Sequence, residues 1–244
     1  MKNTKVNKID SGILWQGASR IDGSPIVAII TSDSRNTKTG NMPQVWILRS
    51  DTDPIMANRT GLDYAICGSC PHRGTPNYTR ESGTASERSC YVLLQNAPLR
   101  IYRKFAKGGY HVLTDEQLEG IVQGTVTRIG AYGDGAAMPD DVIHRIRKYA
   151  EGVTAYTHQG LSADSTYMQS ADTLQVAQNA WKAGKRTFRI VSSYAEQQAN
   201  EVICPSSKGV QCRDCGLCDG NKQAKSVVIE VHGNGAKAFR NRKG

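Results

Sequence analysis

The sequence predicts an α/β fold, a complete or partial βα barrel, in a single domain that spans residues 1–244. In the second half of the chain, short apolar runs rich in β-branched residues alternate with segments of helical spacing. This alternation is typical of a parallel sheet with right-handed crossovers. A cysteine-rich segment, residues 204–220, lies between the last two predicted strands. It is therefore expected to be a loop inserted before the last strand.

The first half of the chain predicts strands followed by helices. Two apolar runs, 26–30 and 44–48, are predicted strands, and the polar stretch 32–42 between them is a predicted loop. The two strands could form a hairpin or be neighbours in a larger sheet. Residues 91–107 have near-helical spacing interrupted by Pro98. Residues 115–122 start with acidic side chains, which favour the first turn of a helix.

The second half predicts six strands, at 125–129, 152–157, 167–170, 186–191, 201–203 and 227–231. Helical segments separate several of them, at 139–150, 172–183 and 195–200. In a βα barrel the chemistry gathers at the carboxyl ends of the strands. This rule selects Arg128, Tyr132, Asp134, Tyr156, His158, Ser170 and Asp172, and of these Asp134 and His158 are the candidate cofactor-binding residues. Asp172 also follows a strand, but it could equally cap the helix behind it.

The composition indicates which partners and which cellular compartment suit the protein. The formal charge is +9, so an anionic partner, either a nucleic acid or a phosphate-bearing ligand, is possible. Four of the positive charges lie in 237–243, which is expected to be a solvated end. No apolar run approaches the roughly 20 residues that span a bilayer, and no secretory signal is evident. We therefore expect a cytoplasmic protein with reduced thiols and no membrane partner.

The C-terminal cysteines predict a metal centre. Cys204, Cys212, Cys215 and Cys218 lie among glycines and polar residues, where a loop cannot bury thiols as hydrophobic side chains. Three cysteines at two-residue gaps resemble the Cys-x2-Cys-x2-Cys run of bacterial ferredoxins, which binds a [4Fe–4S] cluster. A zinc site remains the alternative, although zinc sites usually take close cysteines in pairs.

A second group of cysteines, formed by Cys67, Cys70 and Cys90, lies far upstream. Three thiolates could hold a [4Fe–4S] cluster with one iron left open. The neighbouring His72 could instead complete a zinc site of three cysteines and one histidine. Some of these cysteines could also join the C-terminal group. The spacing leaves these alternatives open, so zinc at a second site remains possible.

Five stretches together resemble an uncharacterised family of phage-encoded, cysteine-rich proteins, and the resemblance extends from about Cys67 to Gly220. They are 67–74, 90–92, 128–134, 156–159 and 212–220. The resemblance implies a phage protein that works in the host cytoplasm, and it implies no particular reaction. The stretch 128–134 is also similar to radical S-adenosylmethionine barrels. The Cys-x3-Cys-x2-Cys signature of that superfamily is absent from the sequence.

Two functions follow from these observations. The first is an iron–sulfur protein that carries electrons, senses redox state or iron, or performs cluster-dependent chemistry near Asp134 and His158. The second is a zinc-stabilised protein without catalysis that binds nucleic acid or a host protein through its basic surface. The number of iron, sulfide and zinc atoms per chain distinguishes them.

Overall fold

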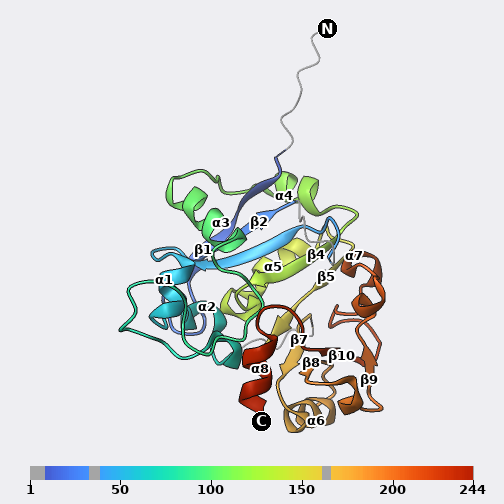
Figure 1. Ribbon diagram of the computed structural model, residues 1–244. Helices are drawn as coiled ribbons and strands as arrows, with labels where there is room; N and C mark the ends of the chain where they lie inside the picture. The colour runs from blue at the N-terminus through green and yellow to red at the C-terminus, as the bar shows by residue number, and fades with distance from the viewer. Residues whose placement is uncertain (1–8, 33–38, 161–165, 244) are drawn as a thin grey trace.

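A computed structural model describes residues 9–32, 39–160 and 166–243 and shows a mixed α/β fold (Figure 1). Its strands form two five-stranded sheets, in the orders β1-β2-β3-β4-β5 and β6-β7-β8-β10-β9. Among the described residues the strands do not close on themselves, so the predicted complete barrel does not form. The parallel strands with intervening helices are consistent with a partial βα arrangement.

The first sheet is mixed. Its strands are β1 (Ser11–Ala18), β2 (Pro25–Thr31), β3 (Gln44–Arg49), β4 (Val126–Tyr132) and β5 (Gly152–Thr154). The first three pair antiparallel, whereas β4 runs parallel to both β3 and β5. The apolar run 26–30 is buried throughout, as expected for a strand covered on both faces. The two predicted strands of the first half therefore form an antiparallel pair.

The second sheet is entirely parallel. Its strands are β6 (Tyr156–Thr157), β7 (Met168–Ala171), β8 (Thr187–Val191), β9 (Glu201–Ile203) and β10 (Ser226–Glu230). The last strand lies between β8 and β9, so the chain between β9 and β10 forms a crossover. This crossover contains the four C-terminal cysteines, as predicted for a loop inserted before the last strand.

One irregular strand connects the two sheets. Residues 152–157 pair with β4 through β5 and with β7 through β6, and Ala155 separates the two parts. The amide of Ala155 donates to the carbonyl of Cys218, and its own carbonyl accepts from Met168. The interruption thus redirects the strand from one sheet to the next and brings it against the cysteine loop.

The helices agree with the local sequence. The α-helices are α1 (Pro54–Arg59), α2 (Tyr64–Cys67), α3 (Ala97–Ala106), α4 (Asp115–Val122), α5 (Asp140–Arg147), α6 (Leu174–Lys182), α7 (Cys212–Cys215) and α8 (Ala236–Lys243). Short 3-10 turns are η1 (Pro71–Arg73), η2 (Gly135–Ala137), η3 (Tyr194–Glu196) and η4 (Pro205–Lys208). Pro98 does not interrupt α3, because it occupies the first turn, where proline is tolerated. None of the described helices is long and apolar enough to cross a membrane.

The C-terminal segment differs from the sequence-based expectation of a solvated end. It forms α8, and Phe239 on this helix is 1% exposed. The Phe239 ring stacks on His72 with the ring centroids 5.8 Å apart. A single aromatic residue among charged ones thus anchors the helix, which lies near β7 in Figure 1.

Candidate metal centres

The four C-terminal cysteines converge on one small cavity. Cys204 follows β9 directly, Cys212 and Cys215 belong to α7, and Cys218 lies in the turn after it. All four line the same cavity, together with Thr154 of β5 and Val227 of β10. They remain free thiols. The arrangement therefore brings together the four residues that the sequence predicts as one set of ligands.

The cysteine loop is held to the sheets through its backbone. Arg186 donates to the carbonyls of Leu217, Asp219 and Lys225, each at 2.7 Å. The Asp219 carboxylate accepts from Arg147 and from the amide of Val153. The amide of Cys204 donates to Val228 of β10 at 2.8 Å. These bonds hold the two ends of the loop, at Cys204 and at 217–225, and none of them involves Cys212 or Cys215.

The thiols of this loop have polar neighbours. Burial raises the pKa of Cys218 to about 12, and the Tyr156 hydroxyl, which hydrogen-bonds the sulfur, opposes the rise. Burial also raises the pKa of Cys212, and the charge of Arg128 acts in the opposite direction. Cys204 contacts the Ser206 hydroxyl at 3.1 Å. Thiolates here would therefore have a hydroxyl or a cation close by.

The three upstream cysteines also form a group. Burial raises the pKa of Cys67 well above its usual value, and the charges of Cys70 and Cys90 add to the effect. Burial likewise raises the pKa of Cys90, and the charge of Cys70 adds to this rise. The charges of the three thiols thus act on one another. The structure does not combine them with the four C-terminal cysteines in one cavity.

The loop that contains Cys67 and Cys70 packs closely against the residues after β6. Gly68 has φ +51°, and a Cβ there would lie 2.4 Å from the Gln159 side chain, so this position favours glycine. Gln159 donates to the carbonyl of Cys67 at 3.2 Å. The Ser69 hydroxyl donates to the carbonyl of His158 at 3.4 Å. The two segments, about ninety residues apart in sequence, are thus joined at the site.

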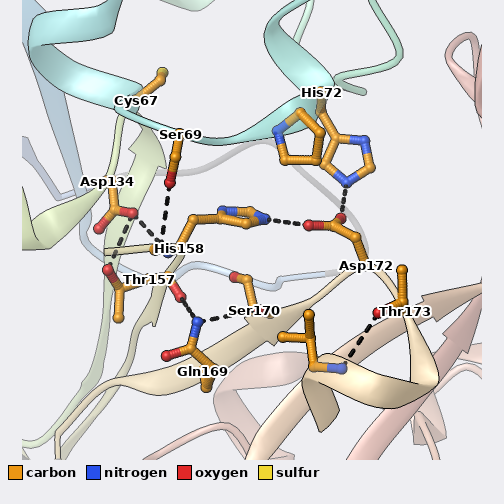
Figure 2. Close-up of polar contacts among 12 residues, drawn as sticks. Cys67, Ser69, His72, Asp134, Thr157, His158, Gln169, Ser170, Asp172 and Thr173 are labelled. Carbon is orange, nitrogen blue, oxygen red and sulfur yellow. Dashed lines mark hydrogen bonds and ion pairs between the residues drawn. The ribbon is translucent and has the colours of Figure 1, made fainter. Parts of the chain in front are cut away.

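A histidine–carboxylate group, drawn in Figure 2, lies beside Cys70. Asp172 faces two imidazoles, with Oδ1 2.8 Å from Nε2 of His72 and Oδ2 3.2 Å from Nε2 of His158. Burial would lower the pKa of His158, but Asp172 and a hydrogen bond with Cys70 raise it to about 10. Burial would raise the pKa of Asp172, but the two histidines hold it well below its usual range.

Asp134 supports this group from behind. Its carboxylate accepts from the amides of Ala136 and His158 and from the Thr157 hydroxyl, at 3.0, 2.9 and 3.1 Å. These three donors satisfy the buried carboxylate and fix the backbone of His158. Of the two candidate cofactor-binding residues, His158 therefore presents its side chain to the cysteines, whereas Asp134 positions it.

Unpartnered polar atoms accumulate around the upstream group. In the described part of the chain, three buried side-chain polar atoms have neither a hydrogen-bond nor an ion-pair partner: Arg88 Nε, Thr127 Oγ1 and Tyr132 Oη. Two of them, those of Arg88 and Tyr132, belong to residues that interact electrostatically with Cys67 or Cys90. None belongs to a residue that lines the four-cysteine cavity. A buried polar atom without a partner is rare and points to a missing ligand.

The spacing of the sulfurs bears on the kind of centre. Zinc holds thiolates at 2.3 Å, so the sulfurs of one tetrahedral site lie about 3.8 Å apart. Among the described residues, which include all seven cysteines, the only three ligand atoms within 4.8 Å of one another are those of His72, His158 and Asp172. In a cubane each thiolate binds a different iron, so the sulfurs are held farther apart. Single-ion spacing is thus found at the histidine–aspartate group of the described residues, and the kind of centre at the cysteines stays a prediction from the sequence.

Sequence reasoning gave several of these residues another role or none. His72 was considered as a zinc ligand beside the cysteines, but it faces Asp172 instead. Asp172 does not cap α6, because the Thr173 hydroxyl accepts from the amide of Val176. Tyr132 and Arg88 had no signal beyond their proximity to strand ends and cysteines. They are identified only by contacts between loops that lie far apart in the sequence.

No family model, no curated protein and no solved structure matches this chain, so the assignment of the site depends on its geometry.

Proposed function

We propose that this chain is a two-centre iron–sulfur protein on a partial βα fold. The four C-terminal cysteines would hold a closed [4Fe–4S] centre, and Cys67, Cys70 and Cys90 a second one with an open iron. When bound, such clusters transfer single electrons and present a Lewis-acidic iron. The closed centre would serve as an electron relay, and chemistry on a substrate would take place at the upstream centre.

The observation that carries this proposal is the set of unpartnered atoms at the upstream cysteines. Tyr132 is 3% exposed, and its pKa is raised first by burial and then by the charge of Cys67. A buried donor costs about 1–3 kcal/mol when it has no acceptor. Cluster sulfides and thiolates are the acceptors that the Tyr132 hydroxyl and Arg88 Nε would find there.

The connection between the two cysteine groups supports a relay. The Tyr156 hydroxyl reaches Cys218, and the His158 ring reaches Cys70. These residues are two apart on an extended segment, so their Cα atoms are separated by roughly 7 Å. Arg128 forms a second link, since it contacts the hydroxyl of Tyr91 next to Cys90 and lies near Cys212. The two centres would thus lie close enough to exchange electrons.

His158 is the residue best placed to move a proton at the open iron. Its imidazole lies between Cys70 and Asp172, and its backbone is fixed by Asp134. A general acid or base needs a defined position and a partner that controls its protonation. Asp172 supplies that partner and favours the protonated ring.

The proposal is tested by counting iron, sulfide and zinc in protein purified without oxygen. We expect a brown protein in which Cys70→Ala and Cys215→Ala each remove about half of the iron, as two separate cubanes require. Mild oxidation should release one iron per chain from the wild type, because an iron without a protein thiolate is the most easily lost. The Cys70→Ala variant should not show this release.

A colourless, folded protein that contains zinc and no sulfide would overturn the proposal. So would variants of both groups that lose the same iron, because they would place all the cysteines on one centre.

A further inference from the structure

We propose that His72, His158 and Asp172 together bind one divalent transition-metal cation, at a position separate from the cysteine centres. The two imidazoles and the carboxylate come from three segments: η1, the turn after β6, and the turn after β7. The proposal uses none of the seven cysteines as ligands. An ion bound to Nε2 of His158 would take that nitrogen out of the proton-transfer role proposed above, so the two roles exclude one another at any one time.

The distances are those of ligands on one ion. Nitrogen and oxygen ligands bound at 2.0–2.1 Å lie about 3 Å from one another. Here Nε2 of His72 and Nε2 of His158 lie 2.8 and 3.2 Å from the carboxylate oxygens, and the three ligand atoms lie within 4.8 Å of one another. Two imidazoles and one carboxylate form a ligand set that leaves coordination positions open for a substrate.

The orientation of His158 is set by the same carboxylate. Its Nε2 is buried and lies 3.2 Å from Oδ2 of Asp172, in an ion pair. In Figure 2 the rings of His72 and His158 converge on the two oxygens of Asp172. An ion at this point would replace the two protons that the imidazoles donate to the carboxylate.

Of the two polar neighbours of His72 Nδ1, one favours metal binding at Nε2 and the other opposes it. The Ser89 hydroxyl lies 2.9 Å from Nδ1 and can accept its proton, which would leave Nε2 free for a metal. Arg242 of α8 also lies 3.1 Å from Nδ1. A guanidinium can only donate, so this contact requires the lone pair on Nδ1 and keeps the proton on Nε2. Arg242 is an exposed residue near the chain end, so it can turn away when the ion binds.

The donor atoms define the class of cation. Imidazole suits Zn²⁺, Fe²⁺ and Co²⁺, whereas Mg²⁺ and Ca²⁺ prefer all-oxygen sites. The competing interpretation is an ion pair in which protonated histidines neutralise Asp172 without metal. If the group binds a metal, its variants should retain less Co²⁺ than wild type. If it is only an ion pair, they should retain as much as wild type.

The test is equilibrium dialysis of the full-length protein against Co²⁺, followed by elemental analysis. Wild type should retain one more Co²⁺ per chain than His72→Ala or Asp172→Ala, with iron and sulfide unchanged. His232→Ala is the matched control, because this exposed histidine lies beyond β10, and it should keep the wild-type count. Arg242→Ala should bind the ion several-fold more tightly, since it removes the competing donor.

Equal Co²⁺ counts in wild type, His72→Ala and Asp172→Ala would overturn the proposal. Any Co²⁺ bound by empty cysteines would appear in all of these proteins and would cancel in the difference. If Asp172→Ala does not fold, Asp172→Asn keeps the shape of the side chain and removes the charge. If the iron–sulfur proposal is wrong, the wild type will lack iron and sulfide, and these are measured separately from Co²⁺.

Discussion

The two cysteine groups differ in what surrounds them. Among the described residues that line the cavity of Cys204, Cys212, Cys215 and Cys218, no buried polar side-chain atom lacks a partner, and four thiols share the cavity. Around Cys67, Cys70 and Cys90 there is one thiol fewer, and two buried polar atoms, on Arg88 and Tyr132, have no partner. The first arrangement is typical of a structural or relay site, and the second of a site that awaits a ligand.

The largest expected effect contrasts one variant from each group. Cys212→Ala should unfold the loop between β9 and β10, because a structural metal contributes directly to folding. A loss of about 3 kcal/mol would lower the Tm by roughly 6–12 °C in a chain of this size. Cys67→Ala should lower the Tm much less, because Arg73 binds Asp63 and the carbonyl of Gly68 and holds that loop without metal. Thermal unfolding of both variants measures the difference, and equal Tm values would contradict it.

Removing the Phe239 ring should affect only the upstream group. Phe239→Ala should cost about 3 kcal/mol locally, since it empties a buried site and frees α8 from His72. We expect faster proteolysis of the C-terminal helix and faster loss of iron in air from the upstream centre. Lys237→Ala, on the exposed face of the same helix, should change neither. Faster iron loss from the four-cysteine centre instead would show that the two regions are not independent.

The smallest effect should be present only in metal-free protein. In metal-free protein Tyr132→Phe should raise the free energy of unfolding by about 1 kcal/mol, because it removes a buried donor that has no acceptor. In loaded protein the gain should disappear, because the hydroxyl then has an acceptor. Denaturant unfolding of both forms measures this.

Tyr149→Phe is the matched control for this prediction. The Tyr149 hydroxyl donates to Asp115 at 3.2 Å, so the change should be slightly unfavourable in both forms. A stabilisation by Tyr132→Phe that persists in loaded protein would indicate that nothing binds near this hydroxyl.

Local sequence patterns predicted those elements that carry their own signals. The predicted helix 115–122 agrees with α4, which begins at a capping box formed by Thr114 and Gln117. The predicted strand 201–203 agrees with β9. By contrast, β1 was not specified, because glycines flank its apolar residues and its pairing shifts between Ile13 and Trp15. The helix α8 was missed because its burial depends on Phe239 alone.

The site was predictable only where its residues are neighbours in sequence. The spacing from Cys204 to Cys218 identified a group that the fold brings to one cavity. His158 was identified through its place after a strand, and it does reach Cys70. The contact of His72 with Asp172 joins residues a hundred positions apart, so no local pattern contains it. The predicted anionic and host partners, and the phage origin, stay predictions.

The break at Ala155 has a consequence for how such a molecule can change over time. Directly after the break Tyr156 reaches Cys218, and two residues later His158 reaches Cys70. Both contacts therefore depend on one short stretch of backbone that is anchored in the second sheet. The two cysteine loops could lengthen or shorten elsewhere without disturbing either contact.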